Sequence, residues 1–384
     1  MKRLRIVVLG YMVRGPLGGL AWHHLQYVLG LVALGHDAWF VEDSDDYPGC
    51  YDPSTGQVDV DPTYGLRFIE AVFRRAGLAD RWAYHDAHRS RWHGPAAGRF
   101  AAGREGADVL LNVSGVNPLR DWMQHVPCRV LIDTDPAFTQ IRHLDDPAAM
   151  ARARNHTHFL SFGENVGQPG CAIPDDSLPW RATRQPIVLE QWPVASPAPH
   201  GPLTTVMQWD SYAPRHHAGR VYGMKSASFQ PYADLPTRSG RPFLVAMGSA
   251  TAPREALAAH RWSLVDPLAV TRDPWSYQDF IAASRAEFSV AKAGYVDSRS
   301  GWFSERSAAY LASGKPVIVQ DSAFTRWLRV PAGVLPFSSP EEALDQLARL
   351  DREYDAQCAA ARRVAQDYFD AGAVLSRLLD DVLA

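Results

Sequence analysis

The stretch that decides the fold runs from Ile6 to Asp43 and reads IVVLGYMVRGPLGGLAWHHLQYVLGLVALGHDAWFVED. It begins with a continuous apolar run, which is typical of a parallel strand covered on both faces. A glycine-rich loop follows, and apolar residues then recur at helical spacing until Gly35, a residue suited to the left-handed position after a helix. A second apolar run at residues 38–41 completes a β-α-β unit. Such units build parallel sheets with right-handed crossovers, so we predict an α/β protein.

Further apolar runs predict strands of this kind in both halves of the chain, at residues 109–113, 130–132, 159–162, 204–207, 243–246, 288–290 and 316–319. A helix is predicted between the last two, over residues 304–312, and a helical pattern runs from Ser339 to Ala384. The proline-rich stretch 169–202 has no helical period. We expect it to connect the two halves, with a short strand near residues 187–189.

Length, charge and cysteine usage exclude several classes of protein. A chain of 384 residues is longer than one hydrophobic core usually serves, so two domains are expected. The net charge of −3 provides no basic field that would attract nucleic acid or a membrane surface. No apolar run approaches the ~20 residues that span a bilayer, and the run after the basic start is too short for a signal peptide. The four cysteines form no CxxC pair, which favours a reducing cytoplasm over a zinc or disulfide framework.

The most informative polar segment reads DSRSGWFSER and covers residues 297–306, between a predicted strand and a predicted helix. A helix N-terminus presents unpaired N–H groups and a partial positive charge, so it suits a phosphate group. Ser300, Gly301 and Ser304 can bring backbone and hydroxyl donors to a diphosphate, and Glu305 can accept hydrogen bonds from ribose or sugar hydroxyls. An ordinary turn capped by Ser304 explains the same residues equally well.

Residues 301–321, GWFSERSAAYLASGKPVIVQD, resemble the donor-binding signature of the GT-B glycosyltransferases. In that superfamily a glycine-containing loop and an acidic residue precede a helix, and a G-x-P-V strand follows. The opening is similar too, with Gly18 and Gly19 between the first strand and its helix. The resemblance implies two Rossmann-like β/α/β domains that face each other across a cleft. It also implies that Gln320 and Asp321 contact the donor sugar.

The resemblance further implies how the chain is divided. We expect an acceptor-binding domain over residues 1–195, a nucleotide-sugar-binding domain over residues 196–365, and a final helix over residues 366–384 that packs back on the first domain. The implied reaction moves a sugar from a nucleotide-sugar donor to a hydroxyl of a small-molecule or glycan acceptor, with no metal or other cofactor. Ala309 stands where many retaining members carry a glutamate, which favours inversion at the anomeric carbon.

Three cations and a glycine turn extend the predicted donor site. Lys292 directly follows a predicted strand and Arg299 lies in the polar loop, and both side-chain types bind diphosphates. Lys225 is a third candidate, although a solvated surface charge is the simpler interpretation of this residue. Gly248 follows another predicted strand and can form a second turn that faces phosphate.

His23 and His24 lie in the first turn of the first predicted helix, beside the cleft that forms at the carboxyl ends of parallel strands. A histidine there can take the proton from an acceptor hydroxyl, because its ordinary pKa lies near working pH. The alternative for either histidine is a solvated surface position. Asp133 and Asp135 follow a predicted strand and can support the base. They also match a metal-binding D-x-D motif, but three residues match often by chance, and we predict no metal site.

Other functions remain open on this fold. A nucleotide-sugar epimerase or hydrolase would use the donor without an acceptor, and a non-catalytic relative would bind the donor without turnover. A dinucleotide-dependent oxidoreductase is disfavoured, because the loop from Gly10 to Gly19 lacks the G-x-G-x-x-G spacing.

Overall fold

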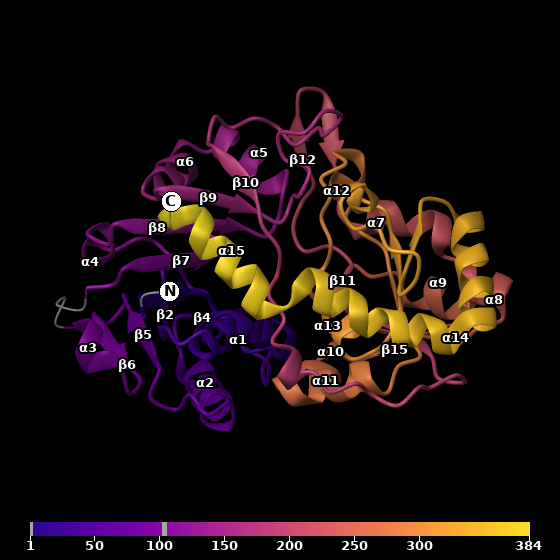
Figure 1. Ribbon diagram of the computed structural model, residues 1–384, viewed down its shortest axis with the longest axis horizontal. Helices are drawn as coiled ribbons and strands as arrows, with labels where there is room; N and C mark the ends of the chain where they lie inside the picture. The colour runs from indigo at the N-terminus through magenta and orange to yellow at the C-terminus, as the bar shows by residue number, and fades with distance from the viewer. Residues whose placement is uncertain (1–2, 102–105) are drawn as a thin grey trace.

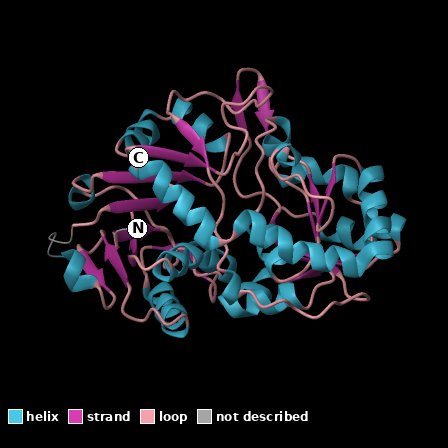
Figure 2. Cartoon of the chain, viewed as in Figure 1, coloured by secondary structure: helices cyan, strands magenta, loops and turns pink. Residues whose placement is uncertain are grey.

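The computed structural model describes residues 3–101 and 106–384, which form two α/β domains, each built on one open sheet (Figure 1). The strands of both sheets are flanked by helices, which cover the apolar surfaces of the sheets (Figure 2). The predicted α/β class is therefore confirmed. None of the described helices is long and apolar enough to cross a membrane.

Within the described residues, the sheet of the N-terminal domain has eight strands, in the order β10 (Trp180–Ala182), β9 (His158–Ser161), β8 (Cys128–Asp133), β7 (Val109–Val113), β1 (Arg5–Leu9), β2 (Asp37–Asp43), β5 (Trp82–Asp86) and β6 (Arg91–His93). Neighbouring strands pair in parallel except β5 and β6. The helices of this domain are α1 (Gly18–Ala33), α2 (Thr63–Arg75), α3 (Ala97–Ala101), α4 (Asp121–Gln124), α5 (Phe138–Asp145) and α6 (Pro147–Arg154). A hairpin of β3 (Cys50–Asp52) and β4 (Gln57–Asp59) lies outside the sheet.

The sheet of the C-terminal domain has, in the same part of the chain, six parallel strands in the order β15 (Trp262–Val265), β14 (Phe243–Gly248), β11 (Leu203–Gln208), β16 (Ala286–Ser289), β17 (Val317–Gln320) and β18 (Val334–Phe337). A hairpin of β12 (Arg215–His217) and β13 (Arg220–Tyr222) follows β11. The helices are α7 (Lys225–Phe229), α8 (Leu235–Ser239), α9 (Arg254–Ala259), α10 (Pro267–Thr271), α11 (Pro274–Ala282), α12 (Ala293–Asp297) and α13 (Glu305–Ala312).

The last two helices join the domains. The first, α14 (Pro340–Phe369), packs on α13 and β18, and α15 (Ala371–Leu383) packs on α1 and β8 of the N-terminal domain (yellow in Figure 1). Asp370 separates them and caps α15 by accepting a hydrogen bond from the backbone N–H of Ala373 at 2.9 Å. Ile187 forms backbone hydrogen bonds of 2.7 and 2.9 Å with the residues on either side of Asp370. The connecting segment and the C-terminal helices therefore hold each other in place.

Helix α1 is buried between its own sheet, α15 and α11 of the C-terminal domain. At Gly18, a Cβ atom would lie 2.6 Å from the carbonyl carbon of Asp273 and still closer to its oxygen. Nearby, Trp22 Nε1 donates a hydrogen bond to the carbonyl of Pro274 at 2.7 Å. The absence of a side chain at Gly18 thus lets the two domains approach through their backbones.

The structure contains several elements that were not predicted, and it departs from the predicted ones at residues 187–189. Residues 187–189 contain an isolated bridge at Ile187 and the start of a 3₁₀ turn, instead of a strand. Strand β10 lies inside the stretch predicted to be a connection, and α12 precedes the polar segment at residues 297–306. Both elements are so short, at three and five residues, that they show no sequence period.

Replacing Gly18 by alanine is expected to destabilise the protein, whereas the same change at Gly19 is expected to be tolerated. The methyl group at Gly18 would meet the backbone of Asp273, but at Gly19 it would lie 3.5 Å from the ring of Tyr277, an ordinary contact. We expect a loss of about 2 kcal/mol in the free energy of unfolding for Gly18→Ala. For Gly19→Ala we expect no loss, because alanine favours a helix over glycine. Urea unfolding measures both variants, and equal stabilities would contradict the close approach.

Candidate functional site

The loop between β1 and α1 is held by one buried carboxylate. Glu42, at the end of β2, is fully buried and accepts hydrogen bonds from the backbone N–H groups of Met12, Val13 and Arg14 at 2.6, 2.7 and 2.8 Å. The guanidinium group of Arg14 adds a contact at 3.4 Å. Burial raises the pKa of Glu42, and Arg14 and the three N–H groups oppose that effect. The loop cannot move without leaving these buried groups unsatisfied.

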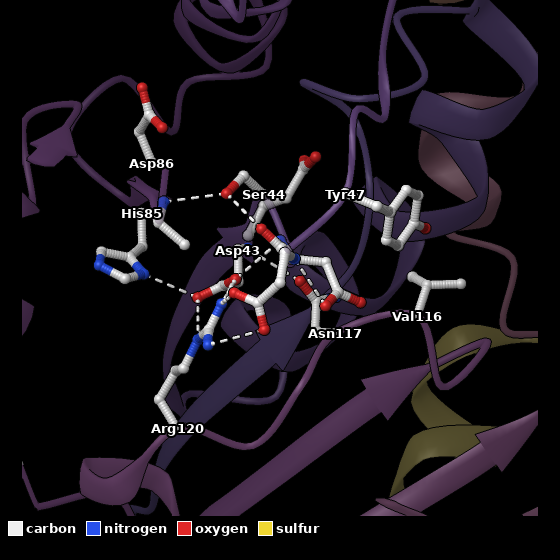
Figure 3. A network of polar contacts seen from close by, with 12 residues as sticks. Asp43, Ser44, Tyr47, His85, Asp86, Val116, Asn117 and Arg120 are labelled. Atoms are coloured by element: carbon white, nitrogen blue, oxygen red, sulfur yellow. Dashed lines mark hydrogen bonds and ion pairs between the residues drawn. The ribbon is translucent and has the colours of Figure 1, made fainter. Parts of the chain in front are cut away.

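The loop after β7 is fixed beside it by the network in Figure 3. Asn117 accepts a hydrogen bond from the backbone N–H of Asp43 and donates one to the carbonyl of Gly10, both at 2.8 Å. The carboxylate of Asp43 accepts from Arg120 at 2.7 and 3.0 Å and contacts His85 at 2.7 Å. Burial alone would raise the pKa of Asp43, but the hydrogen bonds from His85 and Arg120 lower it to about 2. The carboxyl ends of β1, β2 and β7 therefore form one rigid edge.

A neutral histidine supports this edge from the interior. His156 is 8% exposed, its Nδ1 donates to the carbonyl of Ala153 at 2.9 Å, and its Nε2 accepts from the side-chain amide of Asn112 in β7 at 3.1 Å. This pattern fits the neutral ring, which has one donor and one acceptor. Burial lowers the pKa of His156 to about 4.

Both histidines lie in the second turn of α1, not in the first as predicted, because the helix already begins at Gly18. Both are buried, which excludes a solvated surface position for either. His23 is 8% exposed, and its Nε2 lies 3.5 Å from the hydroxyl of Ser114, which contacts the hydroxyl of Thr134 at 2.9 Å. His24 is fully buried, and its Nε2 accepts a hydrogen bond from the backbone N–H of Tyr11 at 3.2 Å. Burial lowers the pKa of both rings, so both are neutral near pH 7.

A narrow cavity between the domains brings His23 together with residues of the C-terminal domain. It is lined by His23, by Glu305 at the start of α13 and by Tyr277 of α11. Tyr11 lies close to the same carboxylate: burial, and then Glu305, raise the pKa of Tyr11 to about 12. The cavity therefore joins a predicted catalytic residue and a predicted donor-site residue.

Side chains from both domains also meet at Asp135, which follows β8. Its carboxylate lies 2.8 Å from Lys292 Nζ, beyond β16, and accepts hydrogen bonds from the hydroxyls of Tyr212 and Tyr295. The ammonium group lies 4.5, 5.3 and 4.9 Å from the ring centroids of Tyr212, Tyr295 and Phe138. Two residues that were predicted separately, Asp135 for catalysis and Lys292 for the donor, thus form one contact across the domain boundary.

Asp133 has a different environment from Asp135. It is 2% exposed and accepts hydrogen bonds from Ser161 at 2.7 Å, from Gln140 at 3.1 Å and from the backbone N–H of Asp135 at 2.8 Å. Burial raises its pKa. Among the described residues, no group of three or more His, Cys, Asp or Glu side chains is placed to hold a metal ion.

The interpretation of Lys225 as a solvated surface charge is wrong. The residue begins α7 and is 9% exposed, because Phe229 of the same short helix packs into the core of the C-terminal domain. Burial, and then the nearby charge of Arg306, lower the pKa of Lys225 well below its usual range. In the described part of the chain, no ion pair is formed by its ammonium group.

Arg306 forms an ion pair with the buried carboxylate of Glu287. Its Nε lies 2.6 Å from Glu287, and its two Nη atoms donate to the hydroxyl of Ser289 and the carbonyl of Val206 at 2.6 and 2.8 Å. These contacts tie α13 to β11 and β16. Lys225 and Arg306 are thus two buried basic side chains beside the buried carboxylate of Glu287, and Lys225 has no ion pair of its own in the described residues, so an anion bound here can pair with it.

The polar loop before α13 is held by internal hydrogen bonds. The hydroxyl of Ser300 donates to the carbonyl of Tyr295 at 3.2 Å, and the N–H of Gly301 donates to the carbonyl of Ser322 at 2.9 Å. Gly301 has φ +74° and packs against Asn165, whose amide donates to the carbonyl of Arg299 at 3.0 Å. These donors are therefore already satisfied within the protein.

The remaining predicted donor residues lie at the carboxyl ends of β14 and β17 and at the start of α13. Ser304 caps α13 by accepting from the N–H of Arg306 at 3.2 Å. A Cβ atom at Gly248 would lie 2.6 Å from Gln208 Cδ. Gln320 accepts from the N–H of Ala291 at 3.1 Å, and Asp321 accepts from the hydroxyl of Thr325 at 2.7 Å.

Several residues of the site were not singled out from the sequence, namely Glu42, Asn117, Tyr212, Tyr295 and Arg306. Glu42 carries a signal that could have been used, because a carboxylate at the end of an apolar strand needs donors from the adjacent loop. The others have no comparable signal, since their partners are distant in the sequence.

No protein-family model matches the sequence, and a comparison with curated protein sequences gives no match. Solved structures match along the whole chain. AviGT4, a glycosyltransferase involved in avilamycin A biosynthesis, is 13% identical, with a TM-score of 0.55 over 99% of this chain and 97% of that one. An alpha-glucosyltransferase in complex with UDP and a 13-mer DNA is 9% identical, with a TM-score of 0.59 over 100% of both chains. Sucrose-phosphate synthase from Thermosynechococcus elongatus is 11% identical, with a TM-score of 0.52 over 99% of both.

These structures have the GT-B architecture, and the chain has the same fold. The predicted pair of Rossmann-like domains that face each other is therefore confirmed. At 9–13% identity the similarity establishes the fold, and the activity must be argued from the site.

Replacing His156 by glutamine is expected to reduce the loss of stability at low pH. The folded-state pKa of about 4 lies below the ordinary value of 6.5, so the unfolded chain binds a proton between these values that the folded chain does not. The stability that the folded protein gains from keeping His156 neutral is fully present above pH 6.5 and is lost as the pH falls toward 4. We expect the decrease in unfolding free energy from pH 7.5 to pH 5 to be about 2 kcal/mol smaller in the variant. Urea unfolding at both pH values measures it. The exposed His125, changed to glutamine, is the control, and an effect of equal size there would contradict the assignment.

Proposed function

We propose that this protein is a glycosyltransferase that moves a sugar from a nucleotide-sugar donor, held mainly by the C-terminal domain, to a hydroxyl group of an acceptor on the N-terminal domain. The observation that carries the proposal is the buried Lys225, which has no ion pair among the described residues and lies beside Arg306, across the domain boundary from the neutral ring of His23. The fold supports it, and the solved alpha-glucosyltransferase with this fold is in complex with UDP. UDP is therefore the first probe of the donor site.

In this proposal the diphosphate of the donor neutralises the charge of Lys225. Lys292 provides a second cation, whose ammonium group exchanges its ion pair with Asp135 for one with the diphosphate. The N-terminus of α13 adds positive potential. Its first residue, Glu305, accepts hydrogen bonds from ribose or sugar hydroxyls and lies within electrostatic reach of both Lys225 and His23.

His23 is assigned as the general base. Its lowered pKa keeps the ring neutral near pH 7 and so able to accept the acceptor proton when the anomeric carbon is attacked. Ser114 and Thr134 form a hydroxyl pair beside its Nε2 and orient the ring or the acceptor hydroxyl. Lys225 and Lys292 then stabilise the charge of the departing diphosphate. We assign this stabilisation to protein groups alone, without a metal ion.

Replacing Lys225 by methionine is expected to weaken UDP binding and to stabilise the free protein. The variant loses a charged hydrogen-bond donor to phosphate, worth roughly ten- to a hundred-fold in affinity, and it also loses a buried cation without an ion pair. Calorimetry with UDP and thermal unfolding measure the two effects. Lys315→Met is the matched control, because that buried ammonium group donates to the carbonyl of Ser196 instead. A variant at Lys225 with unchanged UDP affinity would remove this residue from the donor site.

Replacing His23 by alanine is expected to lower the turnover of sugar transfer about 10²- to 10⁴-fold, with UDP affinity unchanged. Rates are measured in excess chelator, where the wild-type protein is expected to stay active. His24→Ala is the comparison, because His24 faces the Tyr11 backbone and not the cavity. Normal turnover of both variants would place the base at Asp133 or Asp135.

The same assays distinguish the proposed transfer from the other functions. Equally fast consumption of donor without any acceptor would favour an epimerase or hydrolase, and UDP-sugar binding without turnover would favour a non-catalytic protein.

A further inference from the structure

The N-terminal domain contains a pocket that the donor site does not use. Its volume is about 370 Å³, within the range of ligand-binding pockets. It lies between the loops after β2 and β7, strand β8 and helices α5 and α6. Its wall includes Tyr47, Ser114, Asn117, Asp133, Arg142 and Arg152.

One wall of this pocket lies next to the proposed general base. Ser114 lines the pocket, and its hydroxyl lies 3.5 Å from His23 Nε2. The wall near Ser114 is rigid, because Asn117 is bonded to Gly10 and Arg14 donates to the carbonyl of Val116 at 3.0 Å. Ser114 therefore holds a fixed position between this pocket and His23.

The carboxylates that line the pocket already accept hydrogen bonds from other groups of the protein. Asp45 forms a two-pronged ion pair with Arg152 at 2.8 and 3.0 Å. Asp133 is saturated by the hydrogen bonds described above, and Asp146 caps α6 by accepting from the N–H of Ala148 at 2.8 Å. Arg152 is thus neutralised by its partner. None of these groups supplies the counter-charge for the other guanidinium group in the wall.

That other guanidinium group belongs to Arg142 on α5. Its Nε is buried without a hydrogen-bond partner, and within the described residues Arg142 forms no ion pair. The adjacent His143 is engaged elsewhere, by Asp176 at 2.7 Å. A buried charged donor without an acceptor is costly, and a planar guanidinium group is well matched to a carboxylate or a phosphate.

We propose that this pocket binds the acceptor and that the acceptor carries an anionic group, a carboxylate or a phosphate, which pairs with Arg142 while the reacting hydroxyl lies at Ser114 and His23. The inference rests on the proposed glycosyl transfer and specifies the class of acceptor. The ring of Tyr47, 52% exposed at the wall of the pocket, offers an apolar face to the rest of such a molecule.

The test compares three hexose probes, glucose, glucuronate and glucose 6-phosphate, by calorimetry on the full chain with UDP at saturation. At least one anionic sugar is expected to bind about ten-fold or more tightly than glucose, and the difference between glucuronate and glucose 6-phosphate identifies the anion. Arg142→Met is expected to abolish this preference and to leave UDP affinity unchanged. Arg142→Lys is expected to retain part of it. Arg154→Met, an exposed neighbour on α6, is expected to retain all of it.

Three results would overturn the inference: glucose binding as tightly as both anionic sugars, no saturable binding of either anionic sugar, or an unchanged preference in Arg142→Met. Failure of the proposed function would be seen separately, as an absence of UDP binding in the same titrations. A preference for the anionic sugar that depends on Arg142 would then still support an anion site in this pocket.

Discussion

Three successive backbone N–H groups, those of Met12, Val13 and Arg14, point at the buried carboxylate of Glu42. This interaction fixes the path of the chain from β1 to α1. It thereby fixes the start of α1 at Gly18, where the C-terminal domain touches the helix, and the position of His23 one turn later. The N-terminal half of the site is therefore a consequence of one carboxylate that must be satisfied in the interior.

The two domains bring opposite properties to their boundary. On the N-terminal side, burial keeps His23 neutral, and on the C-terminal side the carboxylate of Glu287 pairs with Arg306 and leaves Lys225 without an ion pair in the described residues. Transfer of a sugar to a hydroxyl group requires a neutral group that accepts the proton and, opposite it, basic side chains that can pair with the diphosphate leaving group. The ion pair of Asp135 and Lys292 joins the two sides.

The sequence predicted the architecture better than it predicted the site. The apolar runs and the glycine loop at residues 6–43 belong to strands and a helix that obey local rules, and these elements are found in the structure. The placement of Lys225 was wrong, because its burial depends on Phe229 entering a core assembled from distant strands. The contact between Asp135 and Lys292 joins residues 157 positions apart, so no local pattern reports it. Short elements such as β10 and α12 were missed because they contain no full period.

Hydrogen–deuterium exchange with and without UDP reports which of the two domains holds the nucleotide. UDP is expected to slow exchange mainly in the C-terminal domain, in the segments 208–225 and 290–306 that carry Lys225, Lys292 and the start of α13. No change in exchange, or protection confined to the loops at residues 10–24 and 114–117 of the N-terminal domain, would contradict it.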